Sequence, residues 1–196
     1  TTDESFDREA YSASGTALAL SDWRRETVTK MVRQLYLTVH GANPTAVFGI
    51  SPQGNMSSDF DTLYADIYTW CGSSGYCDYI CPQIYWYIGH KSMDYAAVAR
   101  WWADTVKGTG VSLYIGMADY LAGNSDPKSP WYGTAAIEQQ LALNDTLPQV
   151  AGEVHFRYRL MAENPELLAL YAEAYGEEAQ EPAEPAYLNT RVHDAY

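Results

Sequence analysis

Residues 79–90 have the sequence YICPQIYWYIGH, which decides how the rest of the chain is interpreted. The stretch opens with apolar and aromatic residues, as a buried strand does. From Gln83 onward it changes, because one amide, two tyrosines, one tryptophan and one histidine follow within eight residues. In parallel sheets, residues at the carboxyl ends of strands face the ligand. The stretch therefore predicts a buried strand that ends in a functional site.

The side chains at the end of this stretch suit a sugar. Aromatic faces pack against the axial C–H groups of a sugar ring, and amide and hydroxyl groups pair with its hydroxyls. We expect Gln83 and Tyr85 to bind substrate hydroxyls or to orient a catalytic carboxylate, and Trp86 to be a stacking platform. His90 is close enough in sequence to reach the same cleft. Two alternatives stay open: the aromatic residues pack in the core, and His90 lies in a solvated loop.

The composition predicts a globular protein with one core. The chain has 196 residues, 47% of them hydrophobic, which is enough for one sizeable core. The net charge of −13 and the pI of about 4.5 argue against nucleic acid and anionic membranes as partners, because phosphates require clustered Lys and Arg. No apolar run approaches the roughly 20 residues of a membrane span. Residues 1–4, TTDE, lack the basic and apolar pattern of a signal peptide.

The cysteines predict neither a metal site nor a disulfide framework. Cys71, Cys77 and Cys81 fit no zinc spacing, and an odd number leaves at least one thiol unpaired. We expect three reduced, partly buried thiols, with a Cys71–Cys77 disulfide as the alternative. No metal and no cofactor are expected.

Short apolar runs alternate with stretches of helical periodicity. The expected strands are 46–50, a segment around Ile80, 111–115 and 152–158. The expected helices begin near Asp22 and then cover 63–70, 98–106, 137–141 and 165–175, while residues 1–21 are expected to be mostly loop. Strands roughly 30 to 45 residues apart with helices between them imply parallel βαβ units. The predicted fold is α/β, with four strands in a small open sheet or in half of an eight-stranded barrel, since a whole (β/α)8 barrel takes about 250 residues.

Five short motifs occur along the chain in a fixed order. They are DWRR at 22–25, FGISP at 48–52, DYI with PQIYW at 78–86, WW at 101–102 and LYIG at 113–116. In this order and spacing they resemble the glycosyl-hydrolase-like 10 family of bacterial envelope proteins. The resemblance covers roughly residues 1–158.

The resemblance implies a fold, a substrate and a location. The implied fold is a (β/α)8 TIM barrel, of which this chain supplies strands 5–8, the C-terminal half. The implied substrate is glycan, in some members peptidoglycan strands stripped of peptides, and the implied location is extracytoplasmic, in the cell envelope or secreted. The family's paired aspartates, at the end of its fourth strand, fall just upstream of Thr1. The fragment alone is therefore expected to be inactive.

Glycoside hydrolysis generally needs two carboxyl groups, one on each side of the scissile bond. Asp119 lies at the carboxyl end of the seventh strand and is the catalytic candidate in this chain; the alternative is an Asp that caps a loop. Glu153 and Asp78 lie where a structural role is expected.

Two arginines are candidates for substrate binding. One arginine of the 22–25 motif, Arg24, could clamp a sugar carboxylate or the absent aspartates, because a guanidinium pairs with two oxygens at once. The alternative for Arg24 is a salt-bridged helix start. Arg157, near the end of the eighth strand, faces either the cleft or solvent.

Together these features predict two regions. Residues 1–175 are expected to be a partial glycoside-hydrolase-like barrel domain, and residues 176–196 an acidic Pro/Glu/Ala linker with the start of a further segment. The predicted activity of the intact protein is hydrolysis of glycosidic bonds in bacterial cell-wall or related polysaccharide. The alternatives are a non-catalytic carbohydrate-binding barrel and a self-contained α/β module that self-associates through its exposed sheet edges.

Overall fold

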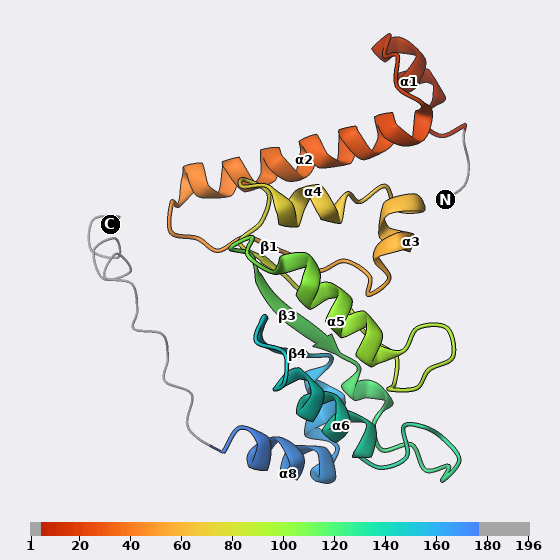
Figure 1. The fold of residues 1–196 in the computed structure, drawn as a ribbon, viewed down its shortest axis with the longest axis vertical. Coiled ribbons are helices and arrows are strands. Elements are labelled where there is room, and N and C mark those ends of the chain that lie inside the picture. Colours follow the sequence, from red (N-terminus) through yellow and green to blue (C-terminus); the bar gives the residue numbers. More distant parts are fainter. Residues whose placement is uncertain (1–4, 177–196) are drawn as a thin grey trace.

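A computed structural model describes residues 5–176 of the chain. Four parallel strands form one sheet in the order β1-β2-β3-β4, which Figure 1 shows between the helices. The strands are β1 (Gly49–Ile50), β2 (Tyr79–Ile80), β3 (Ser112–Met117) and β4 (Val150–His155). The prediction of an α/β fold with a parallel sheet is confirmed. The linker predicted at 176–196 lies, apart from its first residue, outside the described residues.

Helices connect successive strands, as parallel pairing requires. They are α1 (Arg8–Ser14), α2 (Leu20–Ala42), α3 (Met56–Asp61), α4 (Ile67–Gly72), α5 (Tyr95–Val106), α6 (Ala135–Asn144), α7 (Tyr158–Ala162) and α8 (Pro165–Ala174), with a short 3-10 turn, η1 (Asp119–Leu121). Within residues 5–176, none of these helices combines the length and the apolar character that a bilayer crossing demands.

The helix boundaries follow local capping chemistry. Asn164 accepts a hydrogen bond from the backbone N–H of Leu167 and precedes Pro165, so the predicted start of α8 is confirmed. The predicted helix 63–70 is wrong in its extent. The structure divides this region into α3 and α4, because Asp66 caps a new helix by accepting from the backbone N–H of Thr69.

Residues 8–14 form α1, so the loop predicted there is wrong. This helix buries none of its residues and therefore has no apolar stripe that periodicity could reveal.

Two strand predictions also change in extent. The strand predicted at 46–50 is only two residues long, and β4 ends at His155 because α7 begins at Tyr158.

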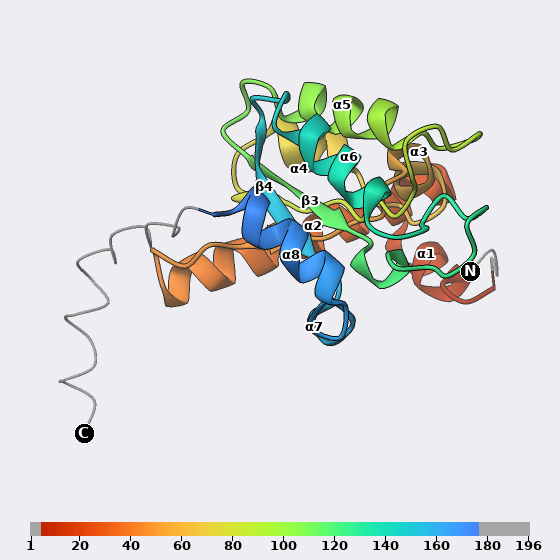
Figure 2. The ribbon, with the colours of Figure 1, turned by 90° about the horizontal axis from the view of Figure 1, so that it is seen from below.

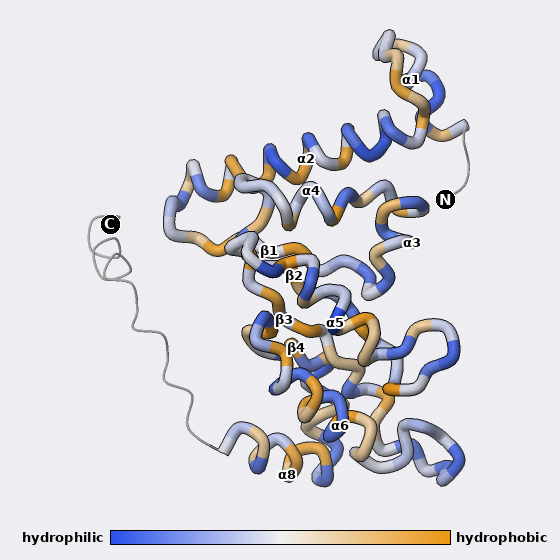
Figure 3. Tube along the Cα trace, in the orientation of Figure 1, coloured by the Kyte–Doolittle hydropathy of each residue, from blue (hydrophilic) through white to orange (hydrophobic). Residues whose placement is uncertain are grey.

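One face of the sheet is covered and forms the core. Ile80, Leu113 and Ile115 are fully buried on this face, together with Trp102 of α5 and Ile137 of α6. Figure 2 shows α5 and α6 side by side along the sheet, and Figure 3 shows hydrophobic residues along the strands while much of α2 is hydrophilic. The Trp102 indole N–H also donates to the Gly54 carbonyl at 2.9 Å. The predicted core role of the tryptophan pair is confirmed for Trp102.

The opposite face of the sheet is open. Its alternate positions include Tyr79 and Tyr114, whose rings meet edge to face with centroids 5.5 Å apart. Val154 and Phe156 continue this face along and beyond β4 and are 47% and 48% exposed. The same strands thus present one buried and one accessible surface.

Asp78 ties three segments together at the amino ends of the strands. Its carboxylate accepts hydrogen bonds from the Phe48 backbone N–H at 2.7 Å and from the Tyr36 hydroxyl at 3.3 Å. His40 Nε2 of α2 lies 2.9 Å from the same carboxylate. Burial, and secondly the Asp78 charge, raise the pKa of Tyr36. The structural role predicted for Asp78 is confirmed.

Candidate functional site

A cleft of about 300 Å³ opens where the strands end. It lies on the open face of the sheet, on the side where ligands bind in parallel α/β proteins. Its walls come from all four strands or the residues that follow them: Ser51, Cys81, Gln83, Tyr85, Gly116, Val154 and Phe156. The cleft is therefore the candidate functional site, and it contains two of the predicted binding residues.

Gln83 enters the cleft because the pairing of β2 continues beyond its last strand residue. Gln83 forms isolated parallel bridges with Gln53 and with Gly116. A side chain at Gly116 would lie 2.9 Å from the Pro82 carbonyl oxygen, so glycine permits the close approach of the two segments. The Gln83 amide donates to the Ser51 hydroxyl at 3.3 Å. The amide is thus oriented within the cleft.

Three aromatic rings gather at one end of the cleft. Tyr85 lies 5.8 Å from Tyr120 and 6.1 Å from Phe156, and the latter two rings are 6.0 Å apart, as centroid distances. Burial, followed by the neighbouring Tyr120, raises the pKa of Tyr85. We call Tyr85, Tyr120 and Phe156 the aromatic cluster. The sequence analysis missed Tyr120 and Phe156, although Phe156 directly follows β4 and Tyr120 lies three residues after β3.

The structure does not bring Trp86 to the cleft. A Cβ atom at Gly54 would lie 2.6 Å from the Trp86 ring, so the indole packs directly against that glycine. The Trp86 carbonyl accepts from the buried Gln140 amide at 2.8 Å. These contacts favour the core-packing alternative for Trp86, and its role as a stacking platform stays a prediction.

His90 stabilises its own loop. Its Nδ1 accepts from the Met93 backbone N–H at 3.1 Å, and its ring meets the Tyr87 ring at 5.2 Å. His90 does not line the cleft. Substrate binding by His90 stays a prediction.

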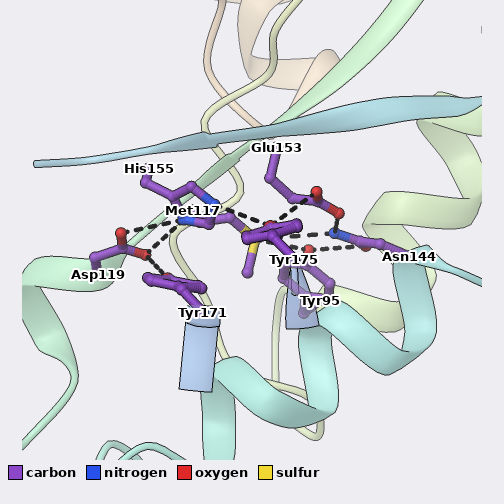
Figure 4. A network of polar contacts seen from close by, with 8 residues as sticks. All are labelled: Tyr95, Met117, Asp119, Asn144, Glu153, His155, Tyr171 and Tyr175. Atoms are coloured by element: carbon purple, nitrogen blue, oxygen red, sulfur yellow. Dashed lines mark hydrogen bonds and ion pairs between the residues drawn. The ribbon is translucent and has the colours of Figure 1, made fainter. Parts of the chain in front are cut away.

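Asp119 is buried and turned toward α8 (Figure 4). It is 1% exposed, and its carboxylate accepts from the Tyr171 hydroxyl at 2.7 Å. His155 Nδ1 lies 3.2–3.3 Å from the two carboxylate oxygens. Burial, and secondly the hydrogen bond to Asp119, raise the pKa of Tyr171. A catalytic role for Asp119 stays a prediction, and this geometry favours a positioning role.

The contacts of His155 continue into a longer polar network (Figure 4). His155 Nε2 lies 3.0 Å from the Tyr175 hydroxyl, which donates to Glu153 at 3.1 Å. The Asn144 amide donates to the other Glu153 oxygen at 3.0 Å and accepts from the Tyr95 hydroxyl at 3.0 Å. Glu153 thus has the structural role predicted for it.

This network fixes the backbone behind the aromatic cluster. Asp119 and His155 immediately precede Tyr120 and Phe156 in the sequence. The Tyr120 backbone N–H donates to the Phe156 carbonyl at 3.2 Å. The contacts that Asp119 and His155 make in the polar network therefore restrain the backbone next to them. This backbone carries the rings of Tyr120 and Phe156 in the aromatic cluster.

The two predicted arginines lie in different surroundings. Arg24 donates from Nε and Nη2 to the two carboxylate oxygens of Asp7 at 2.7 and 2.6 Å. This is the salt-bridged helix start that was the alternative for Arg24. Arg157 is exposed and follows Phe156 directly. Substrate binding by either arginine stays a prediction.

Within the described part of the chain, no group of three or more His, Cys, Asp or Glu side chains is arranged to hold a metal ion. The three cysteines, Cys71, Cys77 and Cys81, are buried free thiols. Burial raises the pKa of the Cys81 thiol, which lies in the cleft wall.

Comparison with known proteins connects this geometry to a family. The sequence matches the family described as Glycosyl hydrolase-like 10 over residues 2–133. It is 36% identical to Glycosyl hydrolase YngK of Bacillus subtilis over 95% of this chain, and 36% identical to Glycosyl hydrolase DigH of Escherichia coli K12 over 77% of it. The match covers 38% of the length of each relative. The resemblance predicted from the five motifs is confirmed, and the chain belongs to the glycosyl hydrolase-like 10 family.

Proposed function

We propose that this chain is part of a glycoside hydrolase that cleaves glycosidic bonds in a bacterial cell-wall polysaccharide, peptidoglycan or a related polymer. The observation that carries the proposal is the cleft at the strand ends, lined by Gln83, Tyr85 and Phe156, in a chain of this family. An oriented amide beside aromatic rings offers a sugar both hydrogen bonds and C–H stacking. The cleft is the glycan-binding site in this proposal.

The four strands are, in this proposal, the last four of a (β/α)8 barrel. Their consecutive parallel order supports this, as does a sheet with helices on one face and an accessible face opposite. The relatives' greater length leaves room for the other four strands. The part of this barrel domain that the structure describes is residues 5–175.

The catalytic carboxyl pair lies, we propose, outside the described residues. Within residues 5–176, the cleft lining contains no carboxylate, and Asp119 faces α8 instead. Hydrolysis by two carboxyl groups therefore requires residues from another part of the protein. This chain would bind and position the glycan but would be inactive alone, and the intact protein would act outside the cytoplasm.

A non-catalytic carbohydrate-binding barrel is the second candidate. The same lack of a carboxylate in the described cleft lining favours it. Both candidates require glycan binding at the aromatic cluster, and only one requires bond cleavage.

Release of reducing ends from peptide-free peptidoglycan glycan strands distinguishes the two candidates. We expect the full-length protein to release reducing ends and this chain alone to release none. Gln83→Ala and Tyr85→Ala in the full-length protein should raise KM, whereas Tyr132→Phe, at an exposed position outside the cleft, should not. Binding without any release by the full-length protein would refute hydrolysis and support the binding candidate.

A further inference from the structure

A second pocket, of about 360 Å³, lies away from the cleft. It is formed by the segment leading into α1, the first turns of α2 and the connection between α3 and α4. Since α2 leads into the amino end of β1 and α3 follows its carboxyl end, the start of α2 lies on the carboxyl-end side of the sheet. Figure 1 shows α1, the start of α2 and α3 on that same side. The residues that line the pocket therefore lie on the carboxyl-end side of the sheet, as those of the cleft do.

The walls of this pocket are aromatic. Trp23 is half-buried and packs against Tyr11, with ring centroids 5.4 Å apart. Phe6 lines the same pocket and is 89% exposed. Tyr64 forms another wall. Such rings bury large apolar area and offer flat faces to a ligand.

Tyr64 is held in an unfavourable backbone conformation. Its φ is 57°, and among the described residues no other non-glycine residue has a positive φ. Strained backbone of this kind often occurs at ligand sites, because the surrounding structure must enforce it. Here Arg24 contributes, since its Nη1 donates to the Tyr64 hydroxyl at 2.7 Å and its guanidinium carbon lies 5.0 Å from the ring centroid.

The charges in the pocket are already paired. Arg24 binds both oxygens of Asp7, and this hydrogen bond lowers the pKa of Asp7 while it raises that of Arg24. The positive charge of Arg24 is therefore matched within the pocket. An anionic ligand would have to compete with Asp7 and would approach a chain of net charge −13. The pocket chemistry favours an uncharged ligand.

Polar groups remain for such a ligand. The Tyr64 oxygen accepts from Arg24, and within residues 5–176 the structure gives its own proton no acceptor. Arg24 has five N–H donors, and the described contacts use three of them. The pocket thus combines aromatic faces with directed donors, and its volume lies within the usual range for ligand sites.

We propose that this pocket binds one neutral sugar unit of a polysaccharide, at a subsite separate from the cleft at the strand ends. The choice of a sugar rests on the proposed function, and the choice of a neutral one rests on the Arg24–Asp7 pair. Trp23 and Tyr64 stack on the sugar ring, and the Tyr64 hydroxyl donates to a sugar oxygen.

Fluorine NMR tests this proposal on the whole chain. Trp23 is one of six tryptophans, so labelling with 5-fluorotryptophan gives few signals, and Trp23→Phe assigns the relevant one. The probes are the neutral hexamer of N-acetylglucosamine and the anionic hexamer of galacturonate. We expect the neutral hexamer to shift the Trp23 signal saturably and to bind more tightly than the anionic one. Tyr64→Phe should weaken this binding about fivefold, as expected for the loss of one hydrogen bond. The matched control Tyr132→Phe should not change it.

Each outcome bears on one proposal or both. If the neutral hexamer shifts other tryptophan signals but not that of Trp23, the second subsite is refuted while glycan binding stands. If the anionic hexamer binds the pocket more tightly than the neutral one, the proposed selectivity of the pocket for a neutral sugar is refuted. A saturable Trp23 shift supports the subsite even if the full-length protein releases no reducing ends. No shift by either probe would overturn it.

Discussion

The two faces of the sheet differ in cover although the same strands make both. On the covered face, Leu113 and Ile115 are fully buried beneath helices, whereas on the open face Val154 and Phe156 are about half exposed. The covered face supplies the burial that stabilises the fold. The open face carries the cleft and the aromatic cluster. In this chain, the burial that stabilises the fold and the candidate site therefore lie on opposite faces of the same strands.

The largest expected effect lies on the covered face. Trp102→Ala removes a fully buried indole and its hydrogen bond to the Gly54 carbonyl. We expect a loss of about 3–5 kcal/mol in the free energy of unfolding, measured by urea denaturation. Val154→Ala on the open face is the control and should cost less than about 1 kcal/mol, because its side chain is already half exposed. Equal losses for the two variants would show that the two faces are packed alike and would contradict the proposed difference between them.

A smaller loss of stability is expected when the hydrogen bond between Tyr171 and Asp119 is removed. Tyr171→Phe removes the hydroxyl that donates to the buried Asp119 carboxylate. We expect a loss of about 1–3 kcal/mol, because the buried Asp119 carboxylate then keeps only its longer contact with His155. Tyr175→Phe, at the end of the same helix, is the matched control and should cost less, since Tyr175 is 47% exposed. Similar unfolding midpoints for the two variants would mean that Asp119 does not depend on Tyr171.

The core also contains a carboxylate that opposes folding at neutral pH. Asp59 is 1% exposed, and its Oδ2 has no hydrogen-bond partner within the described residues. Burial raises the pKa of Asp59 to about 6. Because this is above the unfolded value of about 3.9, the folded state holds the proton more tightly, and stability falls as the pH rises from about 4 to about 6.

Asp59→Asn should therefore stabilise the protein at pH 7 by about 1–2 kcal/mol, because it removes the buried charge. The replacement amide retains an oxygen for the Gln53 backbone N–H, which lies 3.2 Å away. Urea denaturation at several pH values should show that the free energy of unfolding of this variant changes less between about pH 4 and 6 than that of the unchanged protein. Asp61→Asn, at an exposed position of the same helix, is the control. A loss of stability at pH 7 would show that the ionised carboxylate is needed there.

The smallest effect on stability is expected from a substitution on the open face. There the measured quantity is self-association of the chain. An accessible apolar face and unpaired strand edges favour contact between copies. We expect the chain to self-associate in sedimentation velocity, and Phe156→Ser to reduce this while changing stability by less than about 1 kcal/mol. Tyr132→Ser, at an exposed position outside the cleft, should leave it unchanged. A purely monomeric chain would refute this prediction.

Local sequence was enough for the fold class and for part of the cleft. Alternating helical and strand periodicity predicted the parallel sheet. The change in composition at Gln83 indicated the end of a strand, and Gln83 and Tyr85 do line the cleft there. The same rule does not reveal that the Trp86 indole packs against the distant Gly54, and its stacking role stays a prediction. A linear pattern carries no information on such a contact.

The rest of the site depends on contacts between distant segments. His155 and Tyr171 approach Asp119 from 36 and 52 residues further along the chain. Asp7 was not recognised as the partner of Arg24, because α1 has no apolar stripe to reveal it. Periodicity finds elements, whereas these pairings follow from how the elements pack.

The carboxylate of Asp78 has a mechanical consequence. It joins the end of α2, the approach to β1 and the approach to β2 in one set of hydrogen bonds. These hydrogen bonds therefore hold the three segments together at the amino ends of the strands. The cleft lies at the opposite ends of the strands, among η1 and the loops that follow the strands. Side-chain hydrogen bonds thus fix one end of the strands, and the candidate site lies at the other end.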